Sequence, residues 1–244
     1  MLHYRFFAAG ESPALEYAVE NLKQHGYTFL PCPDDSVTHL LLPVPSFDDR
    51  GIVIGGEDLG QLLQQLSPDI TVIGGKLDHP LLKDYKTIDL LKDHQYLTRN
   101  AKITACCAVG MAMELLDGVI ADYPCLVIGW GRIGKSLVRF LRGLDAKVTV
   151  CARKEGDRAI LRALGYESED ITNVDPRNYR IIFNTAPQML LPETPAGILK
   201  IDLASVAGLG GRDVIRARSL PRLRAPYSSG KLIAQTIIEK EALL

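Results

Sequence analysis

A run of ten residues in the middle of the chain constrains the fold more than any other part of the sequence. Cys125 to Ile128 is a short apolar stretch of the kind that forms a buried strand, and it leads directly into Gly129-Trp130-Gly131-Arg132-Ile133-Gly134. Lys135 to Leu144 follows with helical periodicity, and Lys147 to Cys151 has the composition of a second strand. An apolar strand, a G-x-G-x-x-G turn, a helix and another strand in this order predict a dinucleotide-binding βαβ unit.

Each glycine of this pattern has its own expected role. Gly129 lets the chain turn sharply, Gly131 lets backbone amides approach a pyrophosphate, and Gly134 lets the helix close on the sheet. The pyrophosphate would lie at a helix N-terminus, where unpaired amides and the helix dipole favour negative charge. Gly143 is expected to end the helix as a C-cap. The alternative interpretation is a tight strand-to-helix turn that binds nothing.

The end of the second strand indicates which nucleotide would bind. Sites that prefer NAD place Asp or Glu there, about 20 residues after the first glycine, to bind the ribose hydroxyls. This chain has Cys151-Ala152-Arg153-Lys154 instead. Two cations without a carboxylate suit a 2′-phosphate, so NADP is the expected cofactor. Glu155 follows at once, which leaves NAD open, and two basic residues are also compatible with a solvated turn.

Composition narrows the class of protein. The 244 residues include 28 basic and 29 acidic side chains, so no global field favours nucleic acid or an anionic membrane. No apolar run has the length of a membrane span, and Met1 to Gly10 lacks the pattern of a signal peptide, so a cytoplasmic protein is expected. The five cysteines have no metal-ligand spacing; we expect reduced, packed thiols and no metal site.

The first hundred residues predict a small α/β domain without a glycine fingerprint. Short apolar strands alternate there with helices, which implies a parallel sheet covered on both faces. The expected strands are residues 3–8, 27–30, 39–43, 69–73 and 86–90, and the expected helices are 13–26, with Ser12 as N-cap, and 59–66.

The second half continues in the same way. A buried helix is expected over Thr104 to Leu116, and a last helix from Ser228 to Leu244 with Ser228 or Ser229 as its cap. Between them we expect a helix over 156–164 capped by Gly165 and strands at 180–183 and 200–203.

The fold class predicted is α/β, with two Rossmann-like or flavodoxin-like parallel-sheet domains and a cleft between them. Residues 1–101 would form the substrate-side domain, joined by the C-terminal helix 229–244, and residues 102–228 the dinucleotide-binding domain. Ligands collect at the carboxyl ends of parallel strands. The cofactor set is therefore Gly129 to Gly134, Ala152 to Lys154, Thr185-Ala186-Pro187, and Leu203-Ala204.

Several segments resemble the A subunit of the dipicolinate synthase family, in the family's order over about residues 100–238. They are Thr104-Ala105, the glycine pattern through Leu137, Val150 to Lys154, Asn184-Thr185-Ala186-Pro187, Ile201-Asp202-Leu203-Ala204-Ser205, and Leu220-Pro221 through Ala225-Pro226 to Gly230. The resemblance implies an oxidoreductase of sporulation that uses NAD(P) to convert a dihydrodipicolinate-type compound into dipicolinate. It also implies a partner, a flavoprotein-like B subunit. Because α/β dehydrogenases of this size are commonly dimers, a homo-oligomer is expected.

The chain departs from that family at the interdomain helix. Where the family tends to carry Pro-Thr-Ala-Glu-Gly, this chain has Ile103-Thr104-Ala105-Cys106-Cys107, without the carboxylate. The family's Thr-Ala-Gly near the end is here Ser228-Ser229-Gly230, which keeps a hydroxyl. Loss of the carboxylate opens an alternative, a non-catalytic NADP(H)-binding protein with a regulatory or scaffolding role.

No residue stands out as the catalytic base. All five histidines precede the nucleotide domain, which argues against 2-hydroxyacid chemistry with a carboxylate-paired histidine from the cofactor domain. A dicarboxylate substrate needs hydroxyl or cationic donors. Ser46, Tyr227, Ser228 and Ser229 are the candidates for this role, although a serine here can be only a helix cap. Asp202 is expected to bond to neighbouring backbone.

Overall fold

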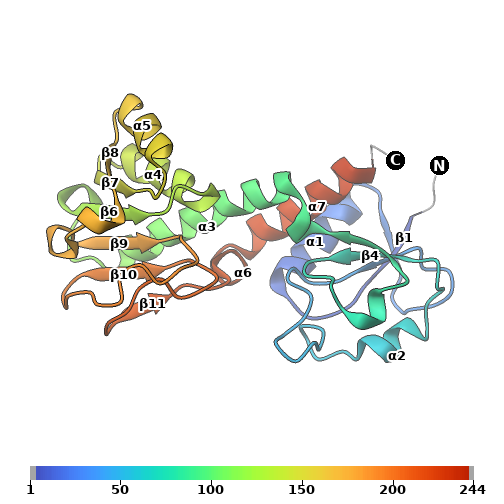
Figure 1. Cartoon of the computed structure of the whole chain (residues 1–244). Coiled ribbons are helices and arrows are strands. Elements are labelled where there is room, and N and C mark those ends of the chain that lie inside the picture. The colour runs from blue at the N-terminus through green and yellow to red at the C-terminus, as the bar shows by residue number, and fades with distance from the viewer. Residues whose placement is uncertain (1–3, 242–244) are drawn as a thin grey trace. The chain divides into compact units, whose positions relative to one another are not determined.

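A computed structural model describes residues 4–241, and within it the chain divides into two compact units. The first unit comprises residues 1–100 together with 221–244, and the second comprises residues 101–220. Each unit contains one sheet whose strands are all parallel, flanked by helices (Figure 1). The α/β class with two parallel sheets is therefore confirmed.

The sheet of the first unit has the strand order β2-β1-β3-β4-β5, which is the flavodoxin-like arrangement. Its strands are β1 (Arg5–Ala8), β2 (Thr28–Phe29), β3 (His39–Leu41), β4 (Thr71–Gly74) and β5 (Lys86–Asp89). Its helices are α1 (Pro13–Gln24), α2 (Leu59–Leu63), the start of α3 (His94–Leu115), α6 (Leu220–Arg224) and α7 (Pro226–Glu241), with short 3-10 helices η1 (Pro80–Leu82) and η2 (Leu90–Lys92).

Close packing of α1 against α7 joins the C-terminal segment to the first unit. A Cβ atom added at Gly230 would lie 2.5 Å from the Ala14 carbonyl oxygen and 2.5 Å from the Tyr17 Cβ, so only glycine fits there. The rings of Tyr17 and Tyr227 meet edge to face with centroids 5.5 Å apart. Two segments at opposite ends of the sequence therefore share one helical layer.

The sheet of the second unit has the order β11-β10-β9-β6-β7-β8, which is the Rossmann order. Its strands are β6 (Pro124–Ile128), β7 (Lys147–Cys151), β8 (Glu167–Glu169), β9 (Ile181–Asn184), β10 (Leu199–Asp202) and β11 (Val214–Arg216). Its helices are the rest of α3, α4 (Arg132–Gly143) and α5 (Glu155–Ala163), with the 3-10 helices η3 (Ile120–Asp122), η4 (Ile171–Asn173) and η5 (Pro176–Asn178).

Alternate residues of the strands in the second unit point to opposite faces of the sheet, and different segments pack on each face. Cys125, Val127 and Phe183 pack with buried residues of α3, α4 and α5. Leu126, Ile128 and Ile182 face the other way, onto the segments that contain η4 and η5 and the loops around 190 and 209. Helices thus support one face of this sheet, and irregular chain supports the other.

Three expectations about helices are wrong in detail. The helix predicted over Thr104 to Leu116 begins ten residues earlier, at His94, and it is not buried all round, because Cys106 and Met113 are exposed. The residues that this helix buries in the core of the second unit are Val109 and three alanines, which let the helix pack closely. Helix α7 begins at Pro226, so Ser228 and Ser229 lie in its first turn and do not cap it.

The end of α4 differs from expectation as well. Gly143 is still helical, and Asp145 takes the left-handed conformation with φ 55°. The Ala146 amide then donates to the Leu141 carbonyl 3.0 Å away, which closes the helix one turn back. The cap at Gly165, with φ 74°, is confirmed. His3 of the first predicted strand and residues 242–244 of the last helix lie outside the described residues.

The cysteines differ in burial, and none of the five forms a disulfide. Burial raises the pKa of the Cys125 thiol to about 12 and, as the largest influence, that of the Cys151 thiol to about 12. Cys32 and Cys106 are exposed, which corrects the expectation that all five are packed.

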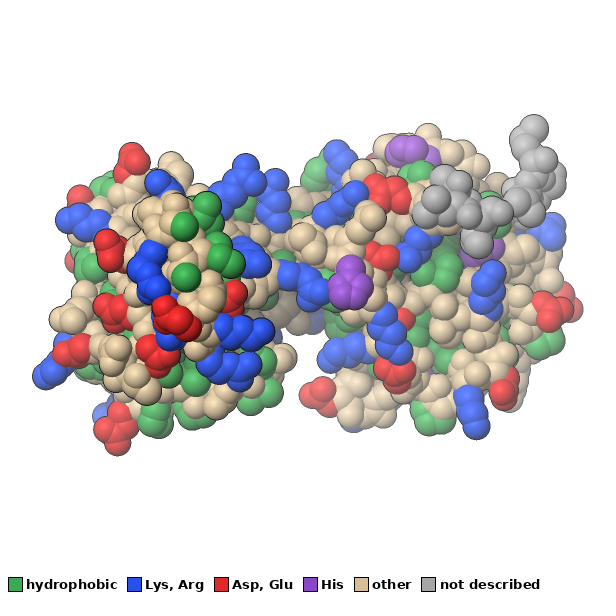
Figure 2. Space-filling view, turned by 45° about the horizontal axis from the view of Figure 1, so that its top comes forward, with side chains coloured by type: hydrophobic (Ala, Val, Ile, Leu, Met, Phe, Trp, Pro, Cys, Tyr) green, Lys and Arg blue, Asp and Glu red, His purple; other side chains and the backbone are tan. Residues whose placement is uncertain are grey.

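Among residues 4–241, no helix combines the length and apolar character needed to span a membrane. Figure 2 shows basic and acidic side chains interspersed over the face in view, in keeping with the net charge of -1.

A partly buried histidine in the first sheet predicts a pH dependence of stability. The His39 ring lies 4.8 Å from the Phe6 ring, and burial, with a smaller effect of the Lys86 charge, lowers the pKa of His39 to about 4, below its ordinary value of 6.5. The unfolded chain therefore binds a proton between these values that the folded chain does not. Stability from neutral His39 is complete above pH 6.5 and is lost as the pH falls toward 4.

When the pH is lowered from 7 to 4, we expect the free energy of unfolding to decrease less in His39→Gln than in the wild type. The full pKa shift corresponds to about 3 kcal/mol, and we expect about 1–2 kcal/mol because the ring is only partly buried. Urea unfolding followed by circular dichroism measures the difference. The exposed His25 gives the control His25→Gln, and equal pH profiles for all three proteins would contradict the assignment.

Candidate nucleotide-binding site

The second sheet reverses its strand order between β6 and β9, and ligands bind at the carboxyl ends of strands at such a point. Gly129 to Gly134 follows β6, and Thr185 to Pro187 follows β9. The two segments are joined directly, because the Thr185 amide donates to the Ile128 carbonyl at 2.8 Å and the Thr185 hydroxyl donates to it at 2.9 Å. The fold therefore brings these two predicted cofactor segments together.

The three glycines differ in what surrounds them. Gly129 has φ 101°, and a Cβ there would lie 2.5 Å from Thr185 Oγ1. A Cβ at Gly134 would lie 2.0 Å from the Gly129 carbonyl oxygen, so this glycine lets α4 approach the turn. A Cβ at Gly131 would meet no atom within 4 Å. Two glycines are thus required by the protein itself, and the third leaves open space.

That open space lies at the N-terminus of α4, a helix of 12 residues. Gly131 is its N-cap, no side-chain cap is made, and the Lys135 amide is the first to bond back, to the Gly131 carbonyl at 3.0 Å. Within the described residues no acceptor is found for the amides of Ile133 and Gly134. Free amides beside an open space fit a pyrophosphate.

Trp130 stands between the first two glycines of the turn. The Lys135 ammonium lies 5.6 Å from the centre of its ring, and the Tyr166 ring lies 6.3 Å away. The indole is partly exposed, as is common for a loop residue, while the neighbouring Arg132 is exposed. Trp130 is the one tryptophan of the chain, so its fluorescence reports on this turn.

The loop after β7 presents two cations to solvent. Arg153 and Lys154 are exposed, and neither side chain has a hydrogen bond or ion pair with any residue that the structure describes. Ala152 before them is buried, and its amide donates to the Glu169 carbonyl at 3.2 Å. The loop is thus anchored to β8 by main chain, with its basic side chains available to a ligand.

Glu155, the residue that left NAD open, is held by two arginines. Arg162 contacts one of its oxygens at 2.6 Å and Arg158 contacts the other at 2.7 Å. These hydrogen bonds, that from Arg162 first, keep the pKa of Glu155 below its ordinary value. The carboxylate is therefore ionised and is paired along α5.

A buried polar network fixes the ends of β9 and β10. Asp202 is fully buried and accepts hydrogen bonds from Asn184 Nδ2 at 2.8 Å, from the amides of Ala204, Gly208 and Leu209, and from Arg216. Burial alone would raise the pKa of Asp202, but these hydrogen bonds lower it below its ordinary value.

The interpretation of Asp202 as a carboxylate bonded to neighbouring backbone is confirmed by this network. The predicted pair Leu203-Ala204 follows it directly, both residues are buried, and the Leu203 amide donates to the Asn184 carbonyl at 2.8 Å.

The four substrate candidates all lie in the first unit. Ser46 is fully buried, and its hydroxyl donates to the Pro43 carbonyl at 2.8 Å and accepts from the Gly75 amide at 3.0 Å, so its role in this structure is to hold a turn. Ser229 is buried, and its hydroxyl has no partner within the described residues. Tyr227 and Ser228 are exposed in the first turn of α7.

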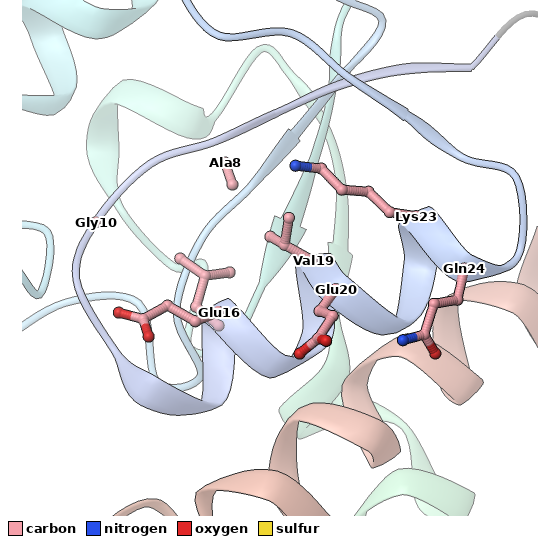
Figure 3. Close-up of a pocket in the computed structure, with 8 residues that line it drawn as sticks. Ala8, Gly10, Glu16, Val19, Glu20, Lys23 and Gln24 are labelled. Atoms are coloured by element: carbon pink, nitrogen blue, oxygen red, sulfur yellow. The ribbon is translucent and has the colours of Figure 1, made fainter.

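A surface groove in the first unit lies beside α1 (Figure 3). It is lined by Ala8, Gly10, Leu15, Glu16, Val19, Glu20, Lys23 and Gln24. Two carboxylates against one ammonium give these residues a net negative charge, which repels a doubly charged anion, so the groove does not suit a dicarboxylate.

Two features of the site were not found by sequence reasoning. The Arg158 side chain extends from α5 to the end of β7, and Arg216 on β11 pairs with Asp202 on the neighbouring strand β10. A lone arginine in a helix or strand carries no motif, so only the contacts reveal either role.

No family model matches the sequence. The A subunit of dipicolinate synthase from Bacillus subtilis (strain 168) is 24% identical over 232 residues, which cover 84% of this chain and 78% of that protein. The crystal structure of the A subunit of dipicolinate synthase from Bacillus halodurans has a TM-score of 0.83 at 21% identity and covers 97% of each chain. An L-alanine dehydrogenase has a TM-score of 0.67 at 13% identity, covering 97% of this chain and 88% of that one.

These likenesses agree with the segments that the sequence analysis singled out. The curated relative carries the same name as the family that those segments resemble. The resemblance is therefore confirmed, and the chain is similar in both sequence and fold to the A subunit of dipicolinate synthase.

Proposed function

We propose that this protein is an NADP-dependent oxidoreductase that oxidises a dihydrodipicolinate-type compound to dipicolinate during sporulation. The observation that carries the proposal is the open space beside Gly131, bordered by the free amides of Ile133 and Gly134 at the switch point of a Rossmann sheet. Similarity to the A subunit of dipicolinate synthase supports the substrate class and a partner, the B subunit of that system. A homo-oligomer in the cytoplasm belongs to the same proposal.

The choice of NADP rests on the charges at the end of β7. Arg153 and Lys154 are exposed and unpaired within the described chain, whereas both oxygens of Glu155 contact arginines. The negative charge of a 2′-phosphate would pair with these two cations. The hydroxyls of an unsubstituted ribose would need a carboxylate acceptor, and Glu155 is already paired with arginines. NADP is therefore favoured over NAD.

A bound nicotinamide would accept the hydride, and the residues of this chain would orient it. Thr185 to Pro187 and Leu203-Ala204, at the ends of β9 and β10, would border the nicotinamide half. Tyr227 and Ser228 carry the exposed hydroxyls among the substrate candidates, and Lys231 on the same helix is exposed too. These groups would serve a substrate with two carboxylates.

One observation favours a second candidate function, an NADP(H)-binding regulatory protein without catalysis. Cys106 and Cys107 stand on α3 where the resembled family tends to carry Glu and Gly, and neither thiol replaces a carboxylate. Such a protein would keep the nucleotide site and influence a partner.

Turnover separates the two candidates. Purified protein mixed with NADP⁺ and dihydrodipicolinate generated in the cuvette should produce reduced cofactor, measured by its absorbance, together with dipicolinate. Nucleotide binding without turnover, even after the B subunit is added, would contradict the oxidoreductase and favour the regulatory role.

Gly131→Val tests whether a nucleotide occupies the site. The valine side chain would enter space that is empty of protein, so we expect a loss of stability no larger than about 1 kcal/mol, from the poorer N-cap. We expect NADPH affinity, measured by quenching of Trp130, to fall at least about tenfold.

The matched control is Gly143→Val in the same helix, where an added Cβ also meets no atom within 4 Å. It should bind NADPH as the wild type does. Unchanged affinity in Gly131→Val would mean that the turn is only structural.

Arg153→Ala/Lys154→Ala tests the choice of nucleotide. Losing two charge-assisted contacts to a phosphate should weaken NADPH about 10-fold to 100-fold and change NADH less than about threefold. Arg139→Ala/Lys147→Ala removes the same net charge from exposed positions elsewhere in the second unit and should leave both affinities unchanged. Equal losses for the two nucleotides in the loop variant would remove the argument for NADP.

A further inference from the structure

Arg158 is the central residue of the loop that follows β7. It lies in the first turns of α5, and its side chain is only 14% exposed although most of this helix faces solvent. Its guanidinium turns back toward β7, and Nη1 donates to the Ala152 carbonyl at 2.7 Å and to the Arg153 carbonyl at 3.0 Å. The Arg158 side chain thus binds two consecutive main-chain carbonyls at the start of the loop.

The same guanidinium holds two carboxylates. Nη1 lies 2.6 Å from Asp170 Oδ2, just after β8, and Nη2 lies 2.7 Å from Glu155 Oε2. The second Asp170 oxygen accepts from the amide and the hydroxyl of Thr172. Hydrogen bonds from Thr172, and then Arg158, keep the pKa of Asp170 below its ordinary value, so this carboxylate is charged.

The contacts of Arg158 therefore determine which charged groups around the loop are paired and which are available to a ligand. Two carboxylates are paired with Arg158, whereas the two cations at the tip of the loop, Arg153 and Lys154, are unpaired within the described chain. Without Arg158, Asp170 would lose the arginine that contacts it and Glu155 would keep only Arg162, so uncompensated negative charge beside the loop would oppose a phosphate.

We propose that Arg158 is a positioning residue that determines the preference for a nucleotide with a 2′-phosphate. It acts through the loop it shapes and through the two carboxylates it holds, without contact with the reacting atoms. This inference rests on the proposed function, because it concerns the same nucleotide site.

The test measures dissociation constants for NADPH and NADH by quenching of Trp130, at neutral pH and one fixed ionic strength. In Arg158→Met we expect the preference for NADPH over NADH to fall at least about tenfold, mainly through weaker NADPH binding. In Arg158→Met/Glu155→Gln/Asp170→Asn the freed carboxylates are neutral, and we expect most of the preference to return.

Two further variants serve as controls. Arg162→Met removes the other arginine on Glu155 and leaves Asp170 and the loop carbonyls in contact with Arg158, so the preference should stay within about twofold of the wild type. Arg158→Lys keeps the charge without the fork of donors and should give an intermediate preference, which covers the case in which the methionine variant folds poorly.

The outcomes separate this inference from the proposed function. Wild-type protein that binds neither nucleotide would overturn both. Wild-type protein that prefers NADPH, with the same preference in Arg158→Met, would overturn the role of Arg158 alone. Equal weakening of both nucleotides without recovery in the triple variant would also overturn it, since the arginine would then only support the fold.

Discussion

The contact on which the second unit depends is the approach of α4 to the turn after β6. Gly134 allows the helix to lie so near the turn that a Cβ there would be 2.0 Å from the Gly129 carbonyl oxygen. The same geometry leaves the N-terminus of α4 without a side-chain cap and with open space at Gly131. The close approach of the helix to the strand and the two amides of Ile133 and Gly134 without an acceptor therefore have one structural cause, and the proposed nucleotide site follows from it.

Around this turn the protein uses buried polar groups to hold strand ends in register. Thr185 bonds to the Ile128 carbonyl, and Asn184 bonds to Asp202, so the ends of β6, β9 and β10 are linked in sequence across the sheet. Asp202 accepts hydrogen bonds from the main chain and from Arg216, so this buried carboxylate is both hydrogen-bonded and paired with a cation.

Prediction from the sequence succeeded where a pattern is long or chemically specific. The extent of β7 was predicted to the residue, because a run of five strand-forming residues stands between a helix end and a basic loop. Strands β8 and β11 were missed, since each has three residues and lies at an edge of its sheet, where no buried face imposes an apolar pattern. The early start of α3 was missed because its first ten residues are largely polar and half-exposed.

The amino-acid order alone determined the glycine turn, the parallel α/β class and the basic pair at the end of β7. Those properties follow from local backbone freedom and from the period of apolar residues, and both can be read along the chain. Only the tertiary structure decided which charges near that pair are free. Glu155 and Arg158 lie three residues apart on one helix, a spacing that the sequence shows. The contacts of Arg158 with Asp170, twelve residues further along the chain, and with the Ala152 carbonyl at the end of β7 depend on the fold and leave no local pattern.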